Sequence, residues 1–286
     1  MRLGWRRGAG WYIGGSSCRD RRDGRGRRHP VPTAARIPLL ALKLTLVPLL
    51  IYIVSMSSKW WGPATAGWLA GPPLMAGPIT YLVIADRGAA YGSEVALYLV
   101  AGVAAADTFN TVFARWCRHH AWQTATLVGC GSWVVAAVIV AMLPMNAPLA
   151  IVIALGSIGV SFWLMPPVTV RPAPTLLTRR DLVLRMLAGV VLTLLVTTAA
   201  AVAGPGWSGV LASFPLLGVI LGVASLRSLG PEHAIAMARG LLLGRFTFAA
   251  FFLCLAWALP AWGVLPAFAI STGLALVVHG VSRRWI

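Results

Sequence analysis

Residues 67–74 read GWLAGPPL and residues 209–216 read GVLASFPL, so five of eight positions are identical at a shift of 142 residues. Without a gap, the same shift aligns Gly62-Pro63 with Gly204-Pro205, Gly88 with Gly230, Gly102 with Gly244, Phe109 with Phe251 and Lys43 with Arg185. Chance matches in an apolar chain would fall on Leu and Ala, whereas Gly and Pro coincide here. The pattern predicts an internal duplication.

The composition indicates a protein that lies within a membrane. Of the 286 residues, 58% are hydrophobic and 11% are charged, whereas a soluble domain carries about 25% charged residues. Crossing a bilayer takes roughly 20 apolar residues in a helix, which satisfies its own backbone hydrogen bonds. We predict an all-α integral membrane protein with about nine transmembrane helices. The segments are 37–57, 64–85, 93–114, 121–143, 147–166, 182–203, 207–226, 234–258 and 262–281.

The shift divides these segments into two repeats of four helices joined by a central helix. The predicted units are an Arg/Gly-rich disordered tail, the first repeat, a linking helix with its loop, the second repeat and a short basic tail, at 1–36, 37–143, 144–181, 182–281 and 282–286. Five crossings separate equivalent helices. Because this number is odd, the second repeat enters from the opposite side, and the repeats have inverted topology.

The net charge of +17 lies in the first tail and between the apolar segments rather than on a soluble face. We therefore interpret it as membrane orientation and expect no nucleic-acid partner. With the residues before Ile37 outside, nearly every basic loop lies inside, as in a multi-pass protein of a bacterial inner membrane. The Arg-rich tail breaks this rule. Either translation starts later, or one proline-containing segment enters the membrane without crossing it.

Two of the apolar segments are predicted to be interrupted. Pro73 and Gly77 lie inside the second segment, and Pro215 and Gly218 lie inside the seventh. Proline removes a backbone donor and clashes with the preceding turn, so neither segment is expected to be one unbroken helix. Corresponding interruptions in two halves indicate a substrate site at the repeat interface. The alternative is a kink with close packing of small residues.

Charged residues also lie deep in the third and eighth segments. Asp107 shares a helical face with Asn110 and Thr111 at i+3 and i+4. Arg245 lies near the centre of the eighth segment, and Arg239 lies nearly two turns earlier. We expect Asp107 and Arg245 to pair, because an isolated charge there is costly. Asp107, Asn110 and Thr111 are candidates for proton or cation coupling, and the two arginines for binding an anionic solute. A static salt bridge is the alternative.

The remaining candidate residues give weaker indications of a functional site. Lys43 and Arg185 are equivalent under the shift, and their long side chains are expected to extend to the membrane interface. Cys117, His119 and His120 lack a second pair of ligands, so we predict a cationic loop, with no metal and no cofactor.

Together these patterns favour a secondary carrier of a small solute, working within the bilayer at the interface of the repeats. The layout of residues 37–281 resembles small carriers with inverted repeats of four or five helices, such as the drug/metabolite and bile-acid types, and no residue roles follow from it. Two alternatives remain: an enzyme acting on a membrane lipid, and a scaffold or assembly subunit that does not transport. The carboxylates Asp86, Glu94, Asp107, Asp181 and Glu232 lie on separate segments, which disfavours the enzyme.

Overall fold

The computed structural model describes residues 33–74, 76–169, 178–201 and 205–285, and every regular element in these ranges is helical. The helices are α1 Thr33–Trp61, α2 Pro63–Ala70, α3 Ala76–Arg87, α4 Ala89–Trp116, α5 Trp122–Met142, α6 Ala147–Leu164, α7 Arg179–Ala201, α8 Pro205–Ala212, α9 Leu216–Leu229, α10 Pro231–Trp262, α11 Val264–Ser282 and the 3₁₀ turn η1 Arg283–Trp285. Most of the predicted tail 1–36 lies outside these ranges, although its last four residues belong to α1.

Six helical stretches in the described ranges have the length and composition needed to cross a membrane. They are Ala89–Trp116, Trp122–Met142, Ala147–Leu164, Val210–Leu229, Pro231–Trp262 and Val264–Trp285. Apolar side chains cover the outside of the peripheral helices, and Leu127, Met142, Trp163 and Leu276 are all more than 65% exposed. A soluble protein would not leave so many large apolar side chains uncovered. The chain is therefore a multi-pass helical membrane protein.

Both segments that were expected to be interrupted are broken in the structure. α2 ends at Ala70 and α3 starts at Ala76, and the intervening chain contains Pro72 and Pro73. α8 ends at Ala212 and α9 starts at Leu216, directly after Pro215. Proline cannot donate to the preceding turn, so the helical ladder stops on its N-terminal side. Each proline-containing segment thus consists of two short helices.

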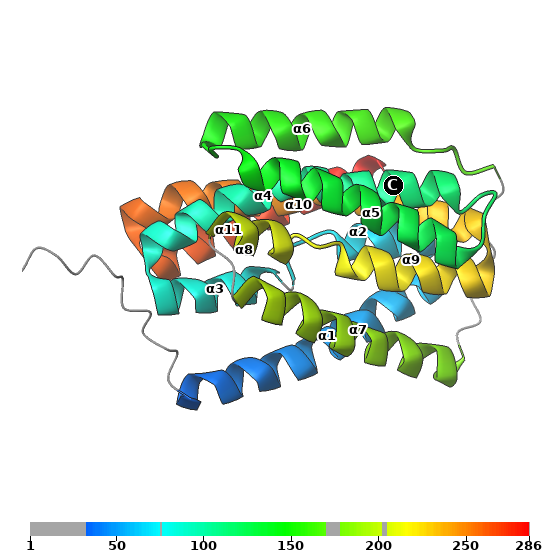
Figure 1. Cartoon of the computed structure of the whole chain (residues 1–286), viewed down its shortest axis with the longest axis horizontal. Coiled ribbons are helices and arrows are strands. Elements are labelled where there is room, and N and C mark those ends of the chain that lie inside the picture. Colours follow the sequence, from blue (N-terminus) through cyan, green and yellow to red (C-terminus); the bar gives the residue numbers. More distant parts are fainter. Residues whose placement is uncertain (1–32, 75, 170–177, 202–204, 286) are drawn as a thin grey trace, which may run out of the picture.

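The long helices α4 and α10 pack against each other at the centre of the molecule. α2 packs on α10, and α8 packs on α4. α6 runs along one side of this pair, and α1 and α7 cross each other on the opposite edge (Figure 1). The core therefore consists of α4, α10 and the short halves of the two broken helices.

Polar contacts bring several helix ends together at one end of the bundle. Arg118, just after α4, pairs with Glu232 in the first turn of α10 and donates to the carbonyl of Pro167, after α6. Ser58, near the end of α1, contacts His233 of α10. Lys59, Arg115, Arg118 and Arg227 lie in or just after the last turns of α1, α4 and α9, at this end of the bundle.

Candidate functional site

The predicted pairing of Asp107 with Arg245 is confirmed. Asp107 Oδ1 of α4 lies 3.3 Å from Arg245 Nε of α10, and their side chains are 0% and 9% exposed. Neither of these two atoms makes a hydrogen bond with any described residue. The contact is therefore mainly electrostatic. A charge-assisted hydrogen bond with good alignment would be stronger.

A third side chain, from the linking helix, completes this cluster. Ser157 of α6 donates to Asp107 Oδ2 at 3.3 Å and to the carbonyl of Ala154 at 2.9 Å. The face of α6 that packs inward is built from small residues, including Ala150, Ala154 and Ser161. These small side chains let α6 lie close to α4. The recurrence of small residues at helical spacing indicates that α6 packs closely, but it does not identify Ser157 as a neighbour of Asp107.

Asn110 and Thr111 follow Asp107 on α4, but they approach a different element. Asn110 Oδ1 lies so near to Gly218 that a Cβ at that glycine would come within 2.9 Å of it. Gly218 is the third residue of α9, just beyond the break at Pro215. Asn110 Nδ2 and Thr111 Oγ1 are buried and have no hydrogen-bond partner among the described residues. Polar groups that make no hydrogen bond with a described residue therefore lie beside the second break.

The first break approaches α10 through two glycines. Gly71 lies against Gly244 so closely that a Cβ on either residue would overlap the backbone of the other. In the same break the carbonyl of Pro73 accepts from the N–H of Gly77 at 2.8 Å, and Gly77 lies beside the ring of Phe251. Gly244 precedes Arg245, and successive helical residues point about 100° apart. The break and the ion pair thus occupy different faces of α10.

Arg239 does not join this cluster. Its Nη1 donates to the carbonyls of Pro166 at 3.0 Å and Met165 at 3.5 Å, at the end of α6. These carbonyls are among those that a helix end leaves without a partner, and a guanidinium stabilises them. In the structure Arg239 fastens the linking helix to α10, away from Arg245.

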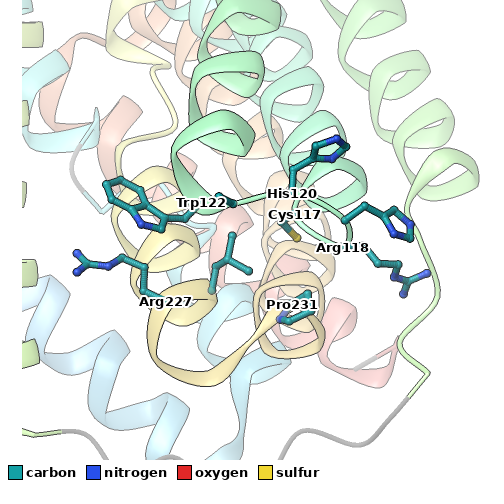
Figure 2. Close-up of a pocket in the computed structure, with 9 residues that line it drawn as sticks. Cys117, Arg118, His120, Trp122, Arg227 and Pro231 are labelled. Carbon is teal, nitrogen blue, oxygen red and sulfur yellow. The ribbon is translucent and has the colours of Figure 1, made fainter.

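A shallow, open depression of about 520 Å³ lies where α4 and α9 end and α5 and α10 begin (Figure 2). It is lined by Cys117, Arg118, His119, His120, Ala121, Trp122, Leu226, Arg227 and Pro231. Arg227 lies over the ring of Trp122, with 5.0 Å between Cζ and the ring centroid, and Arg118 lies on the other side. In the described ranges no three His, Cys, Asp or Glu side chains gather closely enough to hold a metal.

The reactivity of Cys117 tests whether its thiol is buried at this end of the molecule. Burial raises the pKa of its thiol from 9.0 to about 11, which lowers the thiolate fraction at pH 8 by about 100-fold. We expect slow alkylation of Cys117 by iodoacetamide in the folded protein, accelerating as the pH rises toward 11. Peptide mass spectrometry checks this result, with the same protein in dodecyl sulfate as the fast control. Equal rates in both samples would mean that Cys117 is exposed.

The chain was also compared with known proteins. No family model, no curated protein and no solved structure matches it. Any functional conclusion therefore rests on the residues and contacts described above.

Proposed function

We propose that this protein is a secondary carrier of a small solute, built from two inverted repeats. Adding 142 to the first residues of α2, α4 and α5 (63, 89 and 122) gives the first residues of α8, α10 and α11 (205, 231 and 264). The glycines that precede α4 and α10, Gly88 and Gly230, have φ of 87° and 86°, a conformation that glycine adopts readily. Three pairs of equivalent helices therefore start at equivalent positions, and α9 starts two residues before the position equivalent to the start of α3, which supports the duplication.

The directions of the helices support inversion. The end of α4 and the start of α10 meet through Arg118 and Glu232, and the end of α1 lies at the start of α10. Gly189 of α7 contacts Val47 and Ile51 of α1, so equivalent helices also pair with each other along the edge of the bundle. A repeat related by a two-fold axis in the membrane plane would have equivalent helices running in opposite directions.

The reciprocal packing of the two broken helices is the observation that carries the proposal. Gly71, at the end of α2, touches Gly244 of α10. Under the 142-residue shift this pair becomes Ser213 and Gly102, and Ser213 Oγ does donate to the carbonyl of Gly102 at 3.2 Å. Each repeat thus places its broken helix on the long helix of the other. Such interruptions at a repeat interface are typical of carriers that alternate their access.

The ion pair supplies a coupling element for this proposal. Asp107 and Arg245 join α4 to α10, the two helices on which the broken segments rest. A proton or cation on Asp107 would weaken its attraction for Arg245 and so change the contact between α4 and α10. Asn110, Thr111 and the first turn of α9 beside Gly218 are our candidates for solute contact, with free N–H groups that suit an anion. Arg239, which binds carbonyls at the end of α6, and Gly77, which lies beside Phe251, are not part of this proposed site.

A transport assay with the purified protein in liposomes tests the proposal. We expect the purified protein to show saturable counterflow for one member of a panel of small organic anions, and pH-driven accumulation that Asp107→Asn reduces to the background level. Asp181→Asn is the matched control, because Asp181 lies in the first turn of α7, away from α4 and α10, and accepts a hydrogen bond from its neighbour Thr178. Unchanged accumulation and pH dependence in Asp107→Asn would remove the coupling role.

The same experiment addresses the alternatives. A scaffold or assembly subunit would show no counterflow for any solute, and a lipid enzyme would instead change the lipids of the vesicle. We propose the inner membrane of a bacterium as the location, with the basic helix ends inside, since their charge bias matches the positive-inside rule.

A further inference from the structure

Arg185 of α7 is buried inside the protein, and its expected extension to the membrane interface is wrong. The residue is only 4% exposed, and its Nε and Nη2 are buried without a hydrogen-bond partner among the described residues. Leaving two guanidinium nitrogens unpaired away from water costs several kcal/mol in general. A cation in this condition indicates a partner that the described residues do not supply.

The burial follows from a close helix crossing one turn further along α7. A Cβ at Gly189 would overlap Ile51 of α1 and approach Ile220 of α9 within 3.4 Å. Arg185 is four residues before Gly189, so its side chain lies on the same face and points between α1 and α9. Glycine at this crossing brings α1 over the guanidinium and shields it.

Polar groups from two other helices lie near this position. Ser58 Oγ of α1 lies 3.3 Å from His233 Nε2 of α10, and both side chains are buried. His233 lies within electrostatic range of Arg185. It also belongs to the first turn of α10, whose N-cap, Gly230, provides no side-chain acceptor. The free N–H groups and the dipole of that helix end add positive potential.

The neighbouring carboxylates do not satisfy Arg185. The oxygens of Glu232 accept from the backbone N–H of Thr169 and from Arg118. Asp181 is one turn earlier on α7 and attracts Arg185 electrostatically, but its Oδ2 accepts from Thr178. Neither carboxylate therefore makes a hydrogen bond with Nε or Nη2 of Arg185.

The internal repeat does not account for the grouping of Arg185, Ser58 and His233. Under the 142-residue shift Arg185 aligns with Lys43, but His233 aligns with Tyr91 and Ser58 with Ala200. The cation recurs in the first repeat while its polar neighbours do not. A polar set that occurs in one half only is not required by the fold that both halves would share.

We propose that Arg185, Ser58 and His233 form a binding site for one oxyanion group, a phosphate or a carboxylate. Arginine matches the planar or tetrahedral oxygens of such a group with paired N–H donors, and the serine hydroxyl adds a third donor. The group belongs either to the headgroup of an anionic lipid or to a small solute. α1 and α7 form an edge of the molecule, from which either one can enter (Figure 1). The site does not depend on the proposed carrier function.

Binding is measured on the delipidated full-length protein in a non-ionic detergent, through its thermal unfolding. The probes are inorganic phosphate and acetate against chloride at constant ionic strength, and short-chain phosphatidylglycerol against phosphatidylcholine. We expect a saturable rise of several degrees in the unfolding temperature of the wild type with at least one anionic probe. A response to phosphate or acetate identifies a solute site, and a response to phosphatidylglycerol alone identifies a lipid site.

Variants separate this site from general salt effects. Arg185→Gln is expected to lose the response, and Arg180→Gln, which removes an exposed cation one turn away, is expected to keep it. Arg185→Lys and Ser58→Ala should shift the midpoint to higher probe concentration. Arg185→Met should lose the response and, without probe, unfold at or above the wild-type temperature, because an unpaired buried charge is removed. A wild type without any saturable response, or an Arg185→Gln variant that responds normally, would overturn the proposal.

Discussion

Arg245→Met is expected to lower the free energy of unfolding by about 3–5 kcal/mol, because it leaves the carboxylate of Asp107 buried without its cation. The carboxylate is fully buried, and its other polar contact is a 3.3 Å hydrogen bond from Ser157. One hydroxyl donor does not replace a guanidinium. Unfolding of the purified protein in detergent, followed by circular dichroism against temperature or dodecyl sulfate concentration, measures the loss.

The double variant Asp107→Leu with Arg245→Met provides the decisive comparison. Removing both charges eliminates the unpaired carboxylate, so the double variant should recover most of the stability that Arg245→Met loses. Arg227→Met is the matched control, since Arg227 is exposed at the end of α9 and should change stability by less than about 1 kcal/mol. The free energy of unfolding of Asp107→Leu alone completes the comparison. If the losses of the two single variants added up to the loss of the double variant, Asp107 and Arg245 would not be energetically coupled.

Gly240→Ala is expected to destabilise the protein by about 1–3 kcal/mol or more, because α2 and α10 touch there through their backbones. A Cβ at Gly240 would overlap the carbonyl oxygen of Ala64 and come within 2.8 Å of the N–H nitrogen of Trp68. Backbone atoms cannot move aside as a flexible side chain would, so α2 must shift as a whole. The same unfolding measurement applies.

Gly273→Ala in α11 is the control for this substitution. Nothing lies within 4 Å of the Cβ that it adds, and the change should be neutral or stabilising by up to about 1 kcal/mol. A Gly240→Ala variant as stable as Gly273→Ala would show that α2 and α10 do not touch as described. Since α2 is one half of a broken helix, loss of this contact should also affect the proposed transport.

Local chemistry made several features readable from the sequence. The apolar length and Leu/Ala/Gly content indicated membrane helices, and Pro73 and Pro215 indicated the two breaks, because proline acts on the backbone of its own turn. The pairing of Asp107 with Arg245 was also predictable. A buried charge needs a partner, and few opposite charges lie deep enough in the chain.

The sequence did not indicate where the deep arginine side chains point, because their direction depends on which helices cross and where. Arg239 and Arg245 are similar in sequence context, yet Arg239 binds the carbonyls at the end of α6 and Arg245 meets Asp107. Arg185 looked like a residue that would extend to the interface. The close contact at Gly189 instead encloses it between helices.

By itself the sequence determined that this is a helical membrane protein, that two of its segments are interrupted by proline and that one deep acid has a deep arginine to meet. Each of these depends on hydrophobicity, backbone chemistry or charge over a short stretch. Only the tertiary structure decided that Ser157 of α6 joins the pair, that each broken helix packs on a long helix from the other half and that Arg185 is buried with Nε and Nη2 unpaired among the described residues. Those facts depend on close contacts between distant glycines and small residues, whose positions no local pattern specifies.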